Sequence, residues 1–173
     1  METAKQEKSP IEPAAEILFN FAVDRTDIKE LMTGLHQDAK INRNTVEYEL
    51  PILKIITVGW SISYFIGHAP YKNELLEIFW KAIQEFSQNI SSTTEMMTGQ
   101  GIDYFQVLKD RLNMYVDAIN HKPDAPEPAV IIGPEFARAC GNVNDVFTVM
   151  TGSRLFIATA GSVKEYLEKV KLR

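Results

Sequence analysis

The chain has 173 residues, of which 45% are hydrophobic and 24% charged, a composition typical of one globular domain with a sizeable core. Its formal charge of −5 and its pI near 5.3 lead us to expect no nucleic-acid partner, because such proteins normally carry a basic patch. The single cysteine, Cys140, excludes an internal disulfide. Together with a polar N-terminus that lacks the apolar core of a secretion signal, it predicts a cytoplasmic location.

The N-terminal part is predicted to hold a tail and two short helices. Residues 1–12 are charged and punctuated by proline, which is typical of a disordered tail, and one helical domain would then span residues 13–173. Proline can open a first helix over residues 13–23. Either Asp24 or Thr26 caps a second helix, whose apolar residues recur at the spacing of one helix face: Ile28, Leu31, Met32 and Leu35. The polar residues 38–44 read as a loop.

The most apolar stretch of the chain predicts a buried central helix over residues 51–67, with Lys54 as its single formal charge. Pro51 suits the first helical turn, and residues 46–50 before it form either a brief strand or the lead-in to this helix. A strand through the β-branched residues 55–58 is the competing interpretation, but no period-two alternation supports it. A membrane-spanning helix needs about 20 largely apolar residues, and this stretch is shorter and contains Lys54. It therefore favours the core of a water-soluble bundle over integral membrane insertion.

Two amphipathic helices follow the central one. Residues 71–90 carry a continuous apolar stripe that consists of Leu75, Leu76, Phe79, Ile83, Phe86 and Ile90. Residues 102–120 repeat the pattern with Phe105, Leu108, Leu112, Tyr115, Val116 and Ile119. Residues 91–101 between them are rich in turn-forming types, and the proline-rich residues 121–128 form a break that no helix can cross.

The C-terminal third is the hardest part of the sequence to assign. Residues 129–161 are apolar and interrupted by glycine, so short extended segments compete with helices there. A short helix is predicted at residues 134–140, and a last one begins at the capping box Ser162-x-x-Glu165. A run of helices with short breaks indicates an all-α fold, a single-domain bundle of about six helices.

The sequence shows no pattern that marks a catalytic or metal-binding centre. The three histidines, His36, His68 and His121, have no second His, Cys or carboxylate at a strong metal-ligand spacing. The glycine-rich nucleotide motifs and the nucleophile elbow are absent as well. We therefore predict no catalytic residue, no metal and no cofactor, and we expect Cys140 to be a small buried core residue.

One set of polar residues on the central helix is a candidate ligand-binding site. At steps of three and four residues they fall on one line along the helix: Lys54, Thr57, Ser61, Tyr64 and His68. The preferred interpretation is that this polar stripe is the solvent-facing edge of a mostly buried helix. The alternatives are that it pairs with another chain, or that it lines a polar pocket with Lys54 and His68 as the charge-bearing contacts.

These observations favour a non-catalytic interaction or regulatory helical module. We expect it to self-associate, as a homodimer or larger homo-oligomer, through the apolar C-terminal third with residues 146–157 at the interface, or to bind another protein. The alternative is a small-molecule-binding protein or an enzyme that uses the polar stripe. A helical bundle by itself does not decide between them, because bundles serve many functions.

Overall fold

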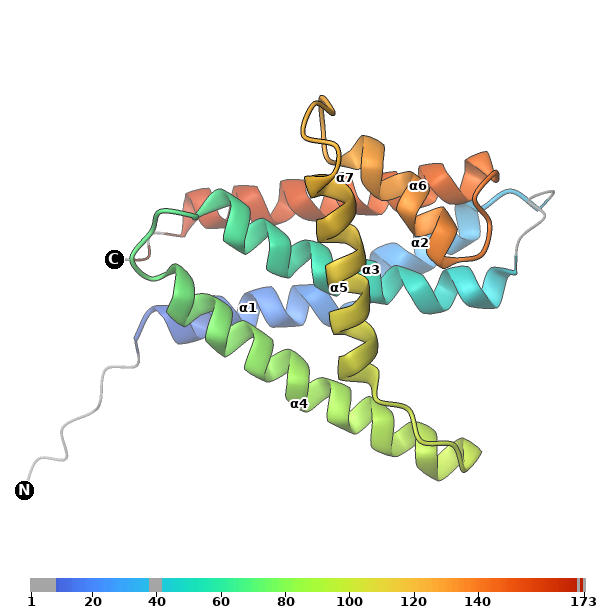
Figure 1. The fold of residues 1–173 in the computed structure, drawn as a ribbon. Helices are drawn as coiled ribbons and strands as arrows, with labels where there is room; N and C mark the ends of the chain where they lie inside the picture. The colour runs from blue at the N-terminus through green and yellow to red at the C-terminus, as the bar shows by residue number, and fades with distance from the viewer. Residues whose placement is uncertain (1–8, 38–41, 171, 173) are drawn as a thin grey trace, which may run out of the picture.

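All regular secondary structure in the described part of the chain is α-helical. The computed structural model describes residues 9–37, 42–170 and 172, and seven helices run through them (Figure 1). Their bounds are α1 Ile11–Val23, α2 Thr26–Gly34, α3 Arg43–Phe65, α4 Lys72–Thr98, α5 Tyr104–Asn120, α6 Ala129–Ala139 and α7 Val146–Lys169. The prediction of an all-α bundle is confirmed, with seven helices where about six were expected.

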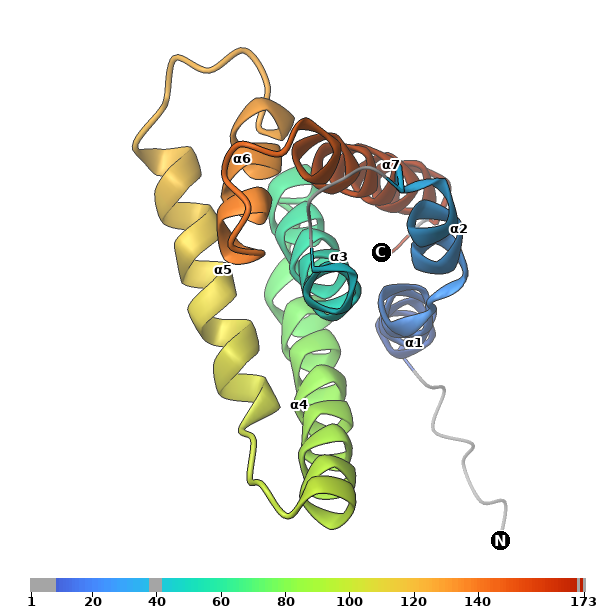
Figure 2. The same ribbon diagram turned by 90° about the vertical axis from the view of Figure 1, so that its right-hand side faces the viewer.

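Helix α3 is the central element, as the sequence predicted. It packs against each of the other six helices. Figure 2 shows α3 with α5 and α6 on one side and α1 and α2 on the other. Its apolar side chains are enclosed almost completely, with Leu50, Ile52, Leu53, Val58 and Ile62 all fully buried. A helix that is apolar around most of its circumference is stable only when it is covered in this way.

The predicted start of the central helix at Pro51 is wrong. Helix α3 begins eight residues earlier, at Arg43, because the Asn42 side chain caps it by accepting hydrogen bonds from the N–H groups of Asn44 and Thr45. Pro51 therefore lies inside the helix and removes one of its backbone hydrogen bonds. Residues 46–50, for which a brief strand was one of two predicted alternatives, belong to the same helix. They include the buried side chains of Val46 and Leu50.

Helix α4 extends well past its predicted end and with α5 forms a hairpin that projects from the bundle (Figure 1). The turn expected at residues 91–101 begins only at Gly99, where φ is 71°. The hydroxyls of Ser91, Thr94 and Thr98 each donate to the carbonyl four residues earlier, at 2.9, 2.8 and 2.7 Å. These bonds satisfy the side chains within the helix, so a serine- and threonine-rich stretch remains helical.

The extended segments considered for residues 129–161 do not occur. Helix α6 covers Ala129–Ala139 with Pro134 inside it, and α7 runs without a break from Val146, so it also passes the predicted start at Ser162. Glycines let the two helices approach closely. A Cβ atom added at Gly133 would lie 2.8 Å from the carbonyl oxygen of Val149, and one at Gly152 would lie 2.6 Å from the Phe136 ring.

The prediction of a disordered tail over residues 1–12 is wrong for residues 11 and 12. Helix α1 begins at Ile11, which is buried, so the end of the predicted tail belongs to the bundle. The rest of that prediction, for residues 1–8, lies outside the described residues, as does the loop predicted at 38–41.

Among the described residues, one helix is long and apolar enough to cross a membrane, and it is α7. Core helices of water-soluble proteins meet the same criteria of length and composition, and much of α7 packs against α3 and α6. These criteria therefore do not decide where the protein resides.

Candidate functional site

The polar stripe on α3 is divided between the interior and the surface. Lys54, Thr57 and Ser61 are fully buried, whereas Tyr64 is 64% exposed and His68 lies in the exposed turn after the helix. The preferred interpretation of a solvent-facing edge is therefore wrong for the first three residues. Helix α7 and the α1–α2 region pack against α3. The periodicity of a sequence shows which residues share a helix face, but it does not show whether another helix covers that face.

Lys54 ties the central helix to the turn between α1 and α2. Its Nζ atom donates to the carbonyl oxygen of Asp24 at 2.7 Å and to Asp27 Oδ1 at 2.9 Å. The ammonium also lies 4.6 Å from the centre of the Phe21 ring, where a cation is attracted to the aromatic face. A buried ammonium must be paired in this way, so the role of Lys54 in this structure is structural.

The other members of the stripe do not complete a binding site with Lys54. The Thr57 hydroxyl donates to the Leu53 carbonyl within the same helix at 2.7 Å, and the Tyr64 ring stacks on Trp60 with centroids 4.7 Å apart. At a rise of about 1.5 Å per residue, roughly 16 Å of helix separate Lys54 from Phe65, the last residue of α3 before the turn that holds His68. A small ligand cannot bridge that span.

A buried ion pair that the sequence did not predict joins α3 to α5. Arg111 donates to both carboxylate oxygens of Glu49, from Nη2 at 2.7 Å and from Nε at 2.9 Å. The Glu49 side chain is 3% exposed and that of Arg111 is 29% exposed. The hydrogen bond to Glu49 raises the pKa of Arg111. The partners are 62 positions apart in the sequence, so no local spacing pointed to the pair.

The Cys140 thiol, which senses the charge of Glu49, is expected to be unreactive. Burial raises the pKa of the Cys140 thiol from 9.0 to about 12, and the charge of Glu49 adds to the effect. A thiol of this kind stays protonated at neutral pH and is a poor nucleophile, in line with the expected core role. Within the described ranges, no group of three or more His, Cys, Asp and Glu side chains could hold a metal ion.

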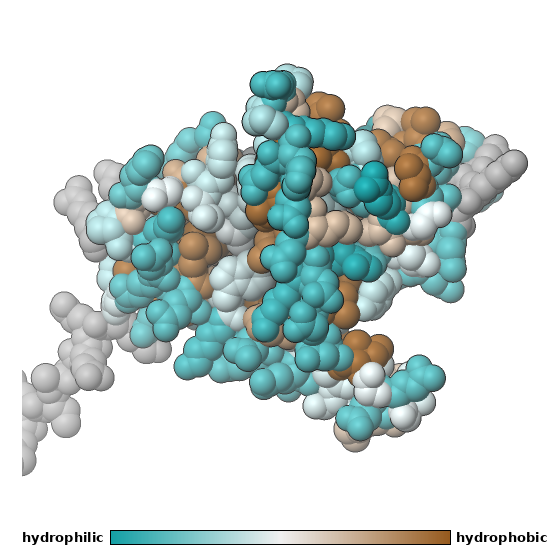
Figure 3. Space-filling view, in the orientation of Figure 1, coloured by the Kyte–Doolittle hydropathy of each residue, from teal (hydrophilic) through white to brown (hydrophobic). Residues whose placement is uncertain are grey.

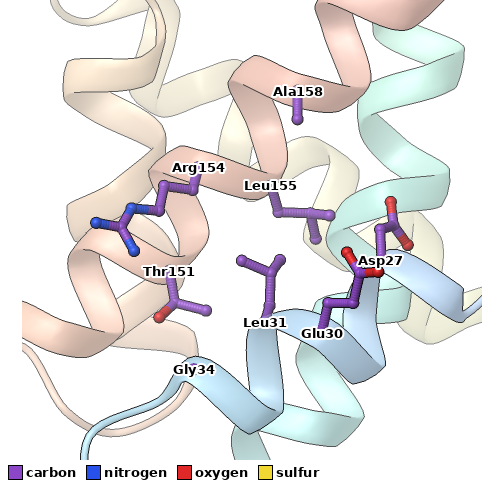
Figure 4. Close-up of a pocket in the computed structure, with 8 residues that line it drawn as sticks. All are labelled: Asp27, Glu30, Leu31, Gly34, Thr151, Arg154, Leu155 and Ala158. Atoms are coloured by element: carbon purple, nitrogen blue, oxygen red, sulfur yellow. The ribbon is translucent and has the colours of Figure 1, made fainter.

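A groove of about 340 Å³ lies between α2 and α7. Figure 4 shows Leu31 of α2 and Leu155 of α7 turned toward each other within it, with Asp27 and Glu30 along the α2 side and Arg154 on α7. Glu30 and Arg154 are exposed, and neither forms an ion pair with another described residue. The groove thus has an apolar floor and opposite charges on its two walls.

The outer side of α7 beside this groove is apolar over most of its first four turns. Its exposed side chains include Val146 at 63%, Phe147 at 41%, Met150 at 43% and Ile157 at 56%. His36, which follows α2, stacks on the Phe147 ring with centroids 5.0 Å apart. In Figure 3 most of the visible face is hydrophilic, and hydrophobic side chains gather where α6 meets the start of α7 and near the α4–α5 turn. We refer to Val146, Phe147, Met150 and Ile157 as the α7 apolar face.

No protein-family model, no curated protein and no solved structure matches this chain. Any functional assignment therefore depends on the surfaces and pockets of the molecule itself.

Proposed function

We propose that the protein is a non-catalytic interaction module that self-associates through the α7 apolar face. The observation that carries this proposal is the exposure of Val146, Met150 and Ile157, which repeat along one side of a helix whose other side is already packed in the core. Large apolar side chains that line up on a surface mark an interaction site more often than singly scattered ones do. The cytoplasmic location belongs to the same proposal, with the single cysteine in its favour.

A second copy of the chain is the partner that the neighbouring charges favour. Glu30 and Arg154 stand on opposite walls of the α2–α7 groove without ion-pair partners among the described residues. In a twofold-symmetric dimer every contact occurs twice, so Arg154 of each copy can pair with Glu30 of the other. The same arrangement brings the two α7 apolar faces together, and it uses one surface of the molecule for both contacts.

The solution mass tests this proposal. Light scattering of the full chain is expected to give about 39 kDa, twice the 19.6 kDa of one copy. Ile157→Glu places a charge within the α7 apolar face and is expected to shift the mass to 19.6 kDa with helix content unchanged. Ile17→Glu is the matched control, because Ile17 is similarly exposed, at 51%, but lies on α1. A wild-type mass of one copy at all concentrations tested, or equal dissociation by both variants, would refute the proposal.

The alternative, a small-molecule-binding protein or an enzyme that uses the polar stripe, has less support. Lys54 is held by Asp27 and the Asp24 carbonyl, and Thr57 bonds within its own helix. A ligand at the stripe would have to break these bonds and open the core around α3.

A further inference from the structure

The apolar stripe of α4 continues past the part of the helix that the bundle covers, into the projecting hairpin (Figure 1). Its members along this length are Phe79, Ile83, Phe86, Ile90 and Met97. The first two are fully buried, the next two are partly buried, and Met97 is 81% exposed. Met97 follows Ile90 by seven positions and Phe86 by eleven, about two and three whole turns, so the three share one face. The stripe is therefore packed in the core at one end and open to solvent at the other.

The projecting hairpin is fixed by its own hydrogen bonds. The Tyr104 N–H donates to Ser91 Oγ at 3.1 Å, which ties the start of α5 to α4. The Asp103 carboxylate caps α5 by accepting from the Gln106 N–H at 3.0 Å. Gly99, in the left-handed conformation, ends α4. The open end of the stripe is thus a preformed surface, and such a surface loses little conformational entropy when it binds a partner.

A notch of about 240 Å³ lies along the stripe, between the hairpin and the α1–α2 turn with the adjoining part of α3. The α4 side of the notch includes Phe86 and Ile90, and the opposite side includes Ile28 and Ile55. Tyr48, which is 44% exposed, stands at its edge. Two apolar walls therefore face each other across an open space. We call this notch and its continuation along α4 to the end of the stripe the hairpin groove.

The hairpin and the opposite wall carry a surplus of negative charge. Residues 82–108 include three charged side chains, and all of them are acidic: Glu85, Glu95 and Asp103. The opposite wall adds Asp24 and Glu47 against Arg25, and Lys29 lies in an adjoining hollow. Five carboxylates thus stand against two cations. Exposed charges act over about 8 Å at physiological ionic strength, so they favour a positively charged partner without all pointing into the groove.

We propose that the hairpin groove binds a cationic amphipathic helix of a partner protein. The apolar face of that helix packs along the stripe from Phe86 to Met97, and its Lys and Arg side chains face carboxylates such as Glu47. At about 1.5 Å per residue, this part of the stripe is roughly 16 Å long, which corresponds to about three turns of a bound helix. A helix fits because the stripe repeats at the spacing with which two helices pack along their lengths. This inference does not depend on self-association through α7.

The probe is a synthetic helical peptide of about 14 residues, long enough for the groove, with Leu on one face and Lys on the other. One control peptide carries Glu in place of Lys, and a second has the composition of the probe in an order without an apolar face. Both are expected to bind the full chain about tenfold more weakly or worse, as measured by fluorescence anisotropy of labelled peptides. Methyl NMR of the methionines gives the location. The Met97 signal is expected to shift saturably, whereas that of Met150, on the α7 apolar face, stays in place.

Substitutions then assign the contact to the stripe and to the charges. Met97→Gln is expected to weaken binding about fivefold or more, whereas Met96→Gln leaves the Kd within about twofold. Met96 is the matched control because it is 87% exposed but points about 100° away around the helix. Glu47→Lys is expected to weaken binding about tenfold, and Arg25→Gln to tighten it. All four side chains are exposed, and circular dichroism checks that each variant is folded.

Four results would overturn the proposal. Equal affinity for the Lys and Glu peptides would mean that charge does not select the partner. A shift of Met150 in place of Met97 would put the peptide on α7. Equal weakening by Met96→Gln and Met97→Gln would mean that the stripe is not the contact. A fall in the solution mass of the chain itself on Met97→Gln would mean that a second copy occupies the groove.

Discussion

The buried ion pair between Glu49 and Arg111 makes the most discriminating prediction about stability. Replacing Arg111 with Met removes both hydrogen bonds to Glu49 and leaves a carboxylate with a 3% exposed side chain in the core. Removing one partner of a buried pair typically costs about 3–5 kcal/mol. The Arg111 side chain is 29% exposed, so water can enter the space it vacates, and we expect a loss of about 2–4 kcal/mol.

The reciprocal variant is expected to cost less. Glu49→Gln keeps the volume of the side chain and leaves an arginine that already contacts solvent, so a loss of about 1–2 kcal/mol follows. At about 2–4 °C per kcal/mol for a chain of this size, Arg111→Met lowers the Tm by roughly 5–15 °C. Urea unfolding followed by far-UV circular dichroism measures the difference directly, because every element is helical.

The double variant Glu49→Met/Arg111→Met separates this reasoning from a simple packing effect. It removes the stranded carboxylate, so it is expected to be more stable than Arg111→Met alone although it carries one substitution more. If Arg111→Met costs no more than Glu49→Gln, or if the double variant is the least stable of the three, then an uncompensated buried charge is not what destabilises the protein.

Three further predictions follow from close packing and from the buried thiol. Gly133→Ala is expected to cost roughly 1–3 kcal/mol, because its Cβ would lie 2.8 Å from the Val149 carbonyl oxygen. Gly161→Ala, with no atom within 4 Å of the added carbon, should stabilise α7 by about 0.5–1 kcal/mol, and equal effects in urea unfolding would contradict this account. Cys140 should react with a thiol reagent at about pH 8 at least ~100-fold more slowly in the native than in the unfolded protein, since burial raises its pKa to about 12. The raised pKa also predicts that stability falls between about pH 9 and pH 12, where the unfolded thiol ionises and the buried one does not, and that Cys140→Ala makes this fall shallower.

The sequence predicted those parts of the fold that depend on local periodicity. The amphipathic stripes of α4 and α5 run as expected, with Leu75, Phe79 and Ile83 fully buried on one and Leu108 and Tyr115 on the other. Each stripe requires only that one helix face meets the core, which the order of apolar residues records directly. The apolar α3 was likewise correctly placed at the centre.

The errors occurred where a local preference was outweighed by contacts elsewhere in the chain. Pro51 favours a helix start, but the Asn42 cap and the packing of α3 on all sides extend the helix through it. Glycine interruptions left a strand in competition with a helix over residues 144–161, whereas in α7 Gly152 gives the Phe136 ring the room it needs. Propensity is a weak prior, and partners distant in sequence decide such positions.

The same limit explains why the polar stripe was expected to face solvent along its whole length. A polar stripe at helical spacing shows that Lys54, Thr57 and Ser61 share a direction, but not whether water or another helix lies in that direction. In this fold α3 is surrounded, so Lys54 serves to anchor the α1–α2 turn and Thr57 bonds within its own helix. Substituting such groups would first destabilise the bundle, and a binding role would be masked by unfolding. Two charged groups without ion-pair partners among the described residues, Glu30 and Arg154, lie instead at the periphery beside apolar surface, where a second copy can reach them without opening the core.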